Sequence, residues 1–215
     1  MVFTGHEFGE GGDYIDSLLL KENAQASFFF TGDFYRNEQF RSLIKRLRRR
    51  GHYLGAHSDQ HLLYCDWKKR DSLLVTNRQF IFDLADNYTA MTRHSIAINQ
   101  AKFFLPPYEW YNDSVAAWTS RYGLQLINYT PGTISHADYT TPADKNFRSS
   151  DSIFRSVTSF ESGHPAGLNG FILLLHVGAG PGRTDKFYYK LPELIKYLKT
   201  KGYSFKRIDE LLVQQ

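Results

Sequence analysis

Short apolar runs alternate with amphipathic segments along most of this chain, and this alternation limits the folds that it can adopt. The apolar runs cover residues 2–5, 27–30, 53–56, 102–105, 124–128, 171–175 and 203–206. Segments with a helical spacing of apolar residues lie between most of them, at 14–22, 38–50, 70–91, 113–122, 151–161 and 190–201. Near-continuous apolar strands that alternate with helices are typical of a parallel sheet covered by helices. The sequence therefore predicts an α/β fold.

The number of strands favours a closed arrangement over an open sheet. Seven strands separated by helices predict a single distorted (β/α)7 barrel with a parallel sheet and outer helices. No glycine-rich dinucleotide fingerprint follows the first strand, which argues against a nucleotide-binding sheet. A chain of 215 residues, 42% of them hydrophobic, can bury a substantial core. We therefore expect one domain over residues 1–215.

Charge and hydropathy exclude two other classes of function. The formal net charge is only +4, and the main basic run, at 45–52, follows apolar residues at helical spacing. We interpret this run as a solvated helix face, so no nucleic-acid partner is expected. No apolar run approaches the roughly 18 residues that a membrane span needs. The sequence therefore predicts no membrane span.

The cellular compartment and the oligomeric state are not determined by the sequence. Cys65 is the only cysteine, so no internal disulfide can form and the redox environment stays open. The first apolar run begins at the second residue, which suggests a longer or exported parent protein. For that parent we expect a secreted, periplasmic or cell-envelope location.

Polar residues of catalytic type follow several predicted strands. His6 and Glu7 follow the first strand, His57 follows the third, the stretch PPYEW at 106–110 follows the fourth, and His176 follows the sixth. In parallel barrels, functional residues gather at the carboxyl ends of the strands. We therefore expect these side chains to converge on one rim of the barrel.

Two histidines four residues apart suggest a metal site. His57 and His61 lie in the segment GAHSDQH, and a helical turn there would present both imidazoles to one point. With one carboxylate they would form a two-histidine, one-carboxylate site for a divalent ion, and Glu7 is the natural third ligand. A His-x-x-x-His pair alone is a weak signal, since two polar residues can share a turn without binding anything. The expected convergence on one rim favours the metal interpretation.

Five motifs resemble those of the polysaccharide deacetylases of carbohydrate esterase family 4, the NodB-homology domain. They are TGHEFG, ASFFFTG, HSDQH, LPPYEW and LLLH, in the family's order and over nearly the whole chain. The resemblance implies a hydrolase that removes N-acetyl or O-acetyl groups from a carbohydrate. It also implies a divalent metal cofactor, with zinc preferred and cobalt, nickel or manganese as alternatives.

The resemblance also implies a role for individual residues. Carried over position by position, the metal ligands fall on Glu7, His57 and His61, the catalytic base on His6, and the general acid on His176. Strand register is taken to favour Glu7 over His6 as the ligand. The reverse assignment, in which His6 binds the metal and Glu7 takes the proton, stays open.

The chain departs from the family pattern at several of these positions. A His-Glu pair replaces the usual Asp-Asp, and Leu105 stands where an arginine normally supports the base. The stretch INYTPG at 127–132 lacks the aspartate that usually orients the acid histidine. Glu109 could fill the polar role of the missing arginine, and we count it as a candidate catalytic residue, although a plain loop carboxylate is the alternative.

The loop after the fourth predicted strand supplies candidate substrate contacts at Pro107, Tyr108 and Trp110, because loop aromatics can stack on sugar rings. The expected partner is an acetylated carbohydrate, whose identity the sequence does not determine. Two alternatives remain beside the deacetylase. One is a degenerate relative that keeps the metal and binds carbohydrate without turnover, and the other is an α/β domain whose histidines are structural.

Overall fold

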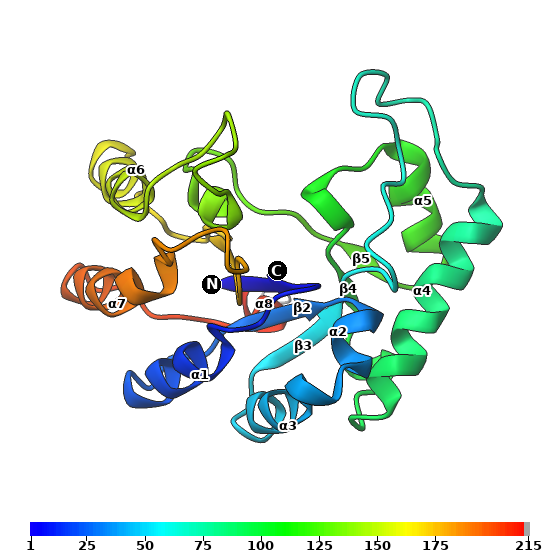
Figure 1. Cartoon of the computed structure of the whole chain (residues 1–215), viewed down its shortest axis with the longest axis horizontal. Helices are drawn as coiled ribbons and strands as arrows, with labels where there is room; N and C mark the ends of the chain where they lie inside the picture. Colours follow the sequence, from blue (N-terminus) through cyan, green and yellow to red (C-terminus); the bar gives the residue numbers. More distant parts are fainter. Residues whose placement is uncertain (213–215) are drawn as a thin grey trace.

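The computed structural model describes residues 1–212 and is built on a parallel sheet (Figure 1). Its strands are β1 (Val2–Gly5), β2 (Ser27–Phe30), β3 (Tyr53–Ala56), β4 (Phe103–Phe104), β5 (Gln125–Leu126) and β6 (Leu174–His176). Their order in the sheet is β5-β4-β3-β2-β1-β6. Each strand therefore lies beside its neighbour in sequence, except that β6 returns to pair with β1. This singly wound order confirms the barrel-like α/β class.

The helices pack on the outer side of the sheet, except the last one, Ile208–Leu212, which lies against the inner apolar layer (Figure 1). They are α1 (Gly12–Lys21), α2 (Gly32–Arg36), α3 (Arg41–Arg49), α4 (Asn77–Thr92), α5 (Asp113–Arg121), α6 (Ser150–Gly163), α7 (Leu191–Thr200) and α8 (Ile208–Leu212). Short 3-10 segments are η1 (Glu38–Phe40), η2 (Ile98–Gln100), η3 (Pro107–Glu109), η4 (Ser135–Tyr139) and η5 (Phe187–Lys190). Within residues 1–212, no helix has the length and apolarity needed to cross a bilayer.

The six predicted helices are present, with one large error in their limits. The prediction of helix at 70–91 is wrong over its first turns, because α4 begins only at residue 77. Thr76 and Gln79 form a capping box there: the Thr76 Oγ1 accepts from the Gln79 N–H at 3.2 Å, and the Thr76 N–H donates to the Gln79 Oε1 at 2.8 Å. This pair satisfies backbone donors at the helix start and so fixes it. The preceding residues form a loop.

The seventh predicted strand, at 203–206, is not formed. This segment has no regular structure and leads into α8. The edge strands β5 and β6 are joined by two hydrogen bonds between loop segments: the Thr130 N–H donates to the Ile172 O at 3.1 Å, and the Ile172 N–H donates to the Thr130 Oγ1 at 3.0 Å. β6 pairs directly with β1, and loop contacts link the two edge strands β5 and β6.

Alternation along the strands separates two apolar layers. Phe3, Phe28 and Leu54 are neighbours in register and belong to the large core beneath the helices. The opposite face lines the inside of the barrel with Val2, Phe29, Tyr53, Phe103, Leu105, Ile127 and Leu174. Both faces are covered, which is why the strands are almost continuously apolar.

The same alternation determines which side chains reach the inner face at the carboxyl ends of the strands. Thr4 pairs in register with Phe29 of β2 and with His176 of β6, so these three residues share the inner face. His6 lies two residues beyond Thr4, and His57 lies two residues beyond Gly55, which is Phe29's partner on β3. The period of two therefore delivers three histidines to one end of the barrel.

The basic run at 45–52 is partly paired within the protein. Asp16 of α1 is buried, and its Oδ2 lies 2.9 Å from the Arg46 Nε of α3. Its Oδ1 lies 2.5 Å from the Arg50 Nη1. Part of this charge therefore joins α1 to α3.

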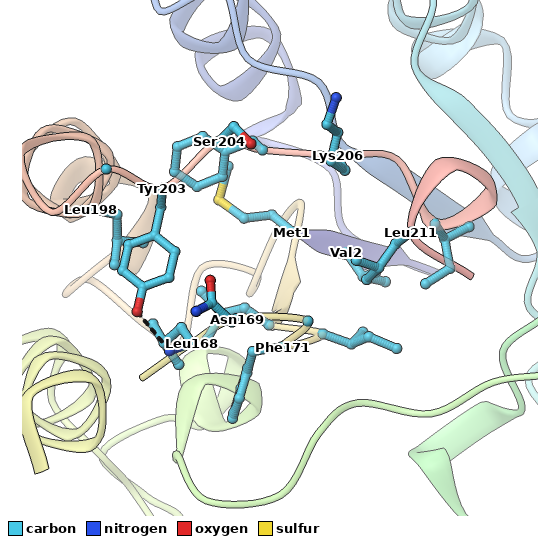
Figure 2. A pocket seen from close by; sticks show the side chains of 16 residues that line it. Met1, Val2, Leu168, Asn169, Phe171, Leu198, Tyr203, Ser204, Lys206 and Leu211 are labelled. Atoms are coloured by element: carbon cyan, nitrogen blue, oxygen red, sulfur yellow. Dashed lines mark hydrogen bonds between the residues drawn. The ribbon is translucent and has the colours of Figure 1, made fainter. Parts of the chain in front are cut away.

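A cavity of about 250 Å³ lies at the amino-terminal end of the barrel (Figure 2). Met1, Leu168, Phe171 and Tyr203 are among its lining residues, and the Leu168 N–H donates to the Tyr203 hydroxyl oxygen at 2.8 Å. None of the candidate catalytic residues borders this cavity. Because functional groups of parallel barrels gather at the other end, we do not assign it a catalytic role.

Helix α8 closes the inner apolar layer through Ile208, which is 2% exposed. We predict that Ile208→Ala lowers the free energy of unfolding by about 3 kcal/mol, because a cavity replaces a packed side chain. Urea denaturation measures this loss. Leu20→Ala is the control, since Leu20 on α1 is 59% exposed and should change stability by less than about 0.5 kcal/mol. Equal losses in the two variants would contradict the role assigned to α8.

Candidate active site

A cleft of about 540 Å³ opens at the carboxyl ends of the strands. The structure brings all the candidate catalytic and metal residues to it: His6, Glu7, His57, His61, Glu109 and His176. Of the three candidate substrate contacts, Tyr108 also lines the cleft. Pro107 is buried within η3, and Trp110 packs against Trp67 at the rim and does not line the cleft. The convergence expected from the strand ends is therefore present.

His57 is buried and its ring orientation is fixed. The backbone N–H of His57 donates to the Asn87 Oδ1 at 2.9 Å. The ring Nδ1 of His57 lies 2.7 Å from the Leu105 carbonyl oxygen. A carbonyl oxygen can only accept, so Nδ1 carries the proton and the neutral ring keeps its lone pair on Nε2. Burial lowers the pKa of His57 to about 3, despite the opposing bond to Leu105. The ring is therefore neutral at physiological pH, and its Nε2 can donate a lone pair to a metal ion.

His61 lies between two other imidazoles. Its ring centroid is 5.0 Å from that of His57 and 4.8 Å from that of His6, and it stacks on His6 at 10°. Burial, together with the nearby imidazoles, lowers the pKa of His61 to about 2. The segment is not a helical turn, because Ser58 and His61 have φ of 72° and 58°. These left-handed residues bring the rings together by a different path from the one expected.

Helix α4 holds this irregular segment through two residues one turn apart. The Asp83 Oδ1 accepts from the N–H groups of Asp59 at 3.1 Å and Gln60 at 3.2 Å. Asn87 accepts from the His57 N–H and donates from its Nδ2 to the Phe30 O at 3.3 Å. Buried side chains on a regular helix thus satisfy the backbone of the loop. Asp83 and Asn87 were not predicted from the sequence, although their i, i+4 spacing within a predicted helix was a usable signal.

The inner position after β1 belongs to His6. Its ring stacks on His61, and its Nδ1 lies 3.2 Å from the Thr31 Oγ1. Glu7 borders the cleft with an exposed side chain, and its carboxylate makes no hydrogen bond or ion pair with other residues of the 1–212 region. Strand register is taken to favour Glu7 as the ligand, but His6 is the residue in phase with the inner-facing Thr4.

The imidazole nitrogens of His57 and His61 are donor atoms of the kind that bind a divalent ion. No three His, Cys, Asp or Glu side chains within residues 1–212 are close enough to form a ready metal site. The donor types are nevertheless suitable: two neutral imidazoles lie side by side, and a carbonyl fixes His57 in the tautomer that presents Nε2. Their lowered pKa values mean that protons compete little with a metal.

His176 is paired with a carboxylate. The His176 Nδ1 lies 2.6 Å from the Asp138 Oδ1, and the His176 N–H donates to the Asp138 Oδ2 at 2.9 Å. Burial lowers the pKa of His176, but the charge and hydrogen bond of Asp138 and the charge of Glu109 outweigh this effect, so the pKa is raised. Asp138 in η4 thus orients His176, a role for which the 127–132 stretch offers no aspartate. Asp138 could not be found from the sequence, because its loop carries no local pattern that marks it.

Arg183 fixes the loop that carries Asp138. It is fully buried, and its Nε and Nη1 each donate at 2.6 Å, to the Asp185 O and the Thr140 O. Its Nη2 donates to the Ser150 Oγ at 3.3 Å. One guanidinium therefore joins η4, the start of α6 and the loop after β6. Arg183 was also not predicted from the sequence as part of the site.

Glu109 is half-buried near the His176–Asp138 pair. Burial raises the pKa of Glu109 to about 7, the charge of His176 opposes this rise, and Asp138 adds to it. Tyr108 and Glu109 have φ of 58° and 55°, a strained pair that turns the loop into the cleft. A carboxyl with such a pKa can gain or lose a proton near neutral pH, which supports a chemical role over a plain loop position.

Comparison with known proteins identifies the family of this chain. The family model described as "polysaccharide deacetylase" matches residues 10–127, more than half of the sequence. The chain belongs to the polysaccharide deacetylase family. The matched region includes His57, His61 and Glu109, but not His6, Glu7, Asp138 or His176. The grouping of these last four therefore rests on the geometry described above.

Two deacetylases illustrate the sequence similarity. The peptidoglycan-N-acetylmuramic acid deacetylase PdaA of Bacillus subtilis is 26% identical over 213 residues, 99% of this chain and 70% of PdaA. A bifunctional xylanase/deacetylase of Pseudobutyrivibrio xylanivorans is 28% identical over 194 residues, 90% of this chain and 27% of that protein.

Solved structures share the fold of this polysaccharide deacetylase family member. A peptidoglycan N-acetylglucosamine deacetylase superposes with a TM-score of 0.73 at 21% identity, covering 98% of this chain and 85% of that one. A family 4 acetyl xylan esterase from Clostridium thermocellum, in complex with a cobalt ion, gives 0.72 at 21%, covering 98% and 87%. A family 4 pseudoenzyme from Bacillus anthracis gives 0.71 at 20%, covering 99% and 65%.

The Asp138 carboxylate should control the protonation of His176 in this deacetylase-family site. We predict that Asp138→Asn lowers the pKa of His176 by about 1 unit or more, because an adjacent negative charge is removed. An NMR titration of the His176 ring measures the change. Asp144→Asn is a matched control, since Asp144 is an exposed carboxylate on the same cleft. An unchanged His176 pKa in Asp138→Asn would contradict the assigned coupling.

Glu109 should make stability depend on pH. Its pKa rises from an ordinary value of 4.5 to about 7 in the folded protein, so the folded state holds a proton that the unfolded state has lost between these pH values. Stability therefore falls as pH rises through this window, by up to the order of 3 kcal/mol. We predict that Glu109→Gln has a higher Tm than the unmodified protein at pH 8 and a similar Tm at pH 4. A Tm difference that does not depend on pH would refute this.

Proposed function

We propose that this protein is a metal-dependent hydrolase that removes N-acetyl or O-acetyl groups from a carbohydrate polymer or oligosaccharide. One observation carries the proposal: the neutral imidazoles of His57 and His61 share a single cleft with the carboxylate-paired His176. Family membership supports acetyl hydrolysis. The names of PdaA and of the xylanase/deacetylase support a sugar polymer as the substrate.

His57 and His61 would hold the metal, together with either His6 or Glu7. The inner position of His6 supports it as the third ligand, whereas Glu7 would keep the family's carboxylate donor. Zinc is the preferred ion, with cobalt, nickel or manganese as alternatives. Such an ion would supply Lewis-acid chemistry, which would polarise the acetyl carbonyl and make a water molecule nucleophilic.

The protein's own residues would move the protons. Asp138 holds the Nδ1 of His176, so Nε2 is the atom that can donate to the departing amine or sugar oxygen. If Glu7 binds the ion, His6 is free to accept the proton of the attacking water. If His6 binds it, Glu7 or Glu109 would take the proton, and Glu109 suits neutral pH because its pKa is about 7.

The loop after β4 would position the sugar. Tyr108 is 44% exposed, and its ring lies 4.4 Å from that of His61, so it can contact a sugar ring held at the metal. Pro107 is buried and shapes the turn that presents Tyr108 and Glu109.

Carbohydrate binding without turnover is the second candidate function. It is favoured by the exposed carboxylate of Glu7, which has no partner among residues 1–212, and by Leu105 at the position of the family's arginine. A pseudoenzyme also shares the fold. Asp138 weighs against this candidate, since it gives His176 the carboxylate that an acid histidine needs.

Metal content and acetate release test these alternatives together. We predict that the protein loaded with zinc or cobalt releases acetate from acetylated chito- or xylo-oligosaccharides or from a chromogenic acetyl ester, and that a chelator abolishes the reaction. His57→Ala should lose most of the bound metal and about 100-fold or more in rate, since even the partners of metal ligands contribute 10- to 100-fold.

His164→Ala is the control, because His164 is exposed at the end of α6 and outside the cleft. Metal binding through His57 without acetate release would support the binding-only candidate. Unchanged metal content and activity in His57→Ala would exclude both metal-dependent functions.

A further inference from the structure

The loop between β3 and α4 places an exposed tryptophan on the rim of the cleft. Trp67 is 54% exposed and lines the cleft together with His61 and Tyr108. Its ring centroid lies 5.4 Å from that of Tyr108, which in turn lies 4.4 Å from that of His61. The three rings form a continuous series from the histidine cluster to the outer edge of the cleft.

The backbone on both sides of Trp67 is fixed by a tight turn. The Asp66 Oδ1 accepts from the N–H groups of Lys68 at 2.8 Å and Lys69 at 2.7 Å. The Asp66 N–H donates to the Ser72 O at 2.9 Å. Although this long loop projects beyond the helices in the upper right of Figure 1, its tip is internally bonded.

The loop after β4 supports Trp67 from behind. The ring of Trp110 lies 5.6 Å from that of Trp67, and the Trp110 Nε1 donates to the Asp66 O at 3.2 Å. The Arg70 guanidinium lies 4.2 Å from the centre of the Trp110 ring, and its Nε donates to the Tyr111 O at 2.6 Å. Trp110 thus serves as a support for Trp67, while more than half of Trp67 stays open.

This arrangement has the properties of a binding surface. Exposed apolar area costs free energy in water, so a large ring held open beside a cleft is poorly explained by packing alone. A rigid aromatic side chain binds a ligand at a low entropic cost. Pyranose rings carry apolar C–H faces that stack on such rings, while their hydroxyl groups remain hydrated.

We propose that Trp67 is the stacking platform of a sugar subsite beside the catalytic centre, and that its occupant is a neighbouring ring of the same acetylated sugar polymer. The identity of this ligand rests on the proposed function. The series His61, Tyr108, Trp67 places the platform beyond the ring that carries the reacting acetyl group. Substrates of several sugar units should therefore be preferred over single sugars.

Two variants of Trp67 test the subsite. Acetylated chito- and xylo-oligosaccharides of one to five units serve as probes, with isothermal titration for binding and acetate release for kcat and KM. Trp67→Ala should weaken binding of the longer probes about tenfold, in the range of one aromatic stacking contact, and raise their KM by a similar factor. Single acetylated sugars and a chromogenic acetyl ester should be unaffected. Trp67→Phe should retain part of the affinity.

Phe82→Ala is the matched control, because Phe82 on α4 is 55% exposed and lies outside the cleft. It should bind every probe like the unmodified protein, and thermal denaturation checks that all variants fold. The subsite is overturned if the unmodified protein binds no oligosaccharide, if Trp67→Ala binds the longer probes normally, or if it loses as much on the small ester. Binding through Trp67 with no acetate release from any probe would refute the proposed activity and leave the subsite standing.

Discussion

The site depends on one constraint, the alternation of side chains along strands that are covered on both faces. Phe3, Phe28 and Leu54 pack under the helices because their neighbours in sequence face the barrel interior. That alternation, continued past the strand ends, directs His6 and His57 into the same space as His176. A shift of one residue in register would turn these side chains outward. The packing of the core and the position of the chemistry therefore have the same physical origin.

Much of the fold could be predicted because its signals are local. The runs at 2–5, 27–30 and 53–56 became β1, β2 and β3 without any change of limits. The run at 203–206 was misleading, since its apolar side chains cover one end of the barrel, and sequence alone does not distinguish such burial from pairing in a sheet. The start of α4 was predictable from Thr76 and Gln79, whose capping pattern is visible in the sequence.

In the site too, the residues with a local sequence signal could be predicted, and those that depend on distant contacts could not. His57, His61 and His176 could be predicted because they follow strands, and the ends of parallel strands meet. Asp138 and Arg183 could not, because they lie in irregular loops. Their partners are 38 and 43 residues away along the chain, at His176 and Thr140. Only the folded chain brings such groups together, and no short-range pattern in the sequence announces them.

The contact between His57 and Leu105 has a consequence for how such a site can change. The imidazole is oriented by the carbonyl oxygen of Leu105, a group that every amino acid provides. The tautomer of the histidine therefore does not depend on which side chain stands at this position, although the Leu105 side chain is itself buried in the inner apolar layer. The backbone at residue 105 therefore orients the imidazole independently of the side chain that packs in the barrel interior.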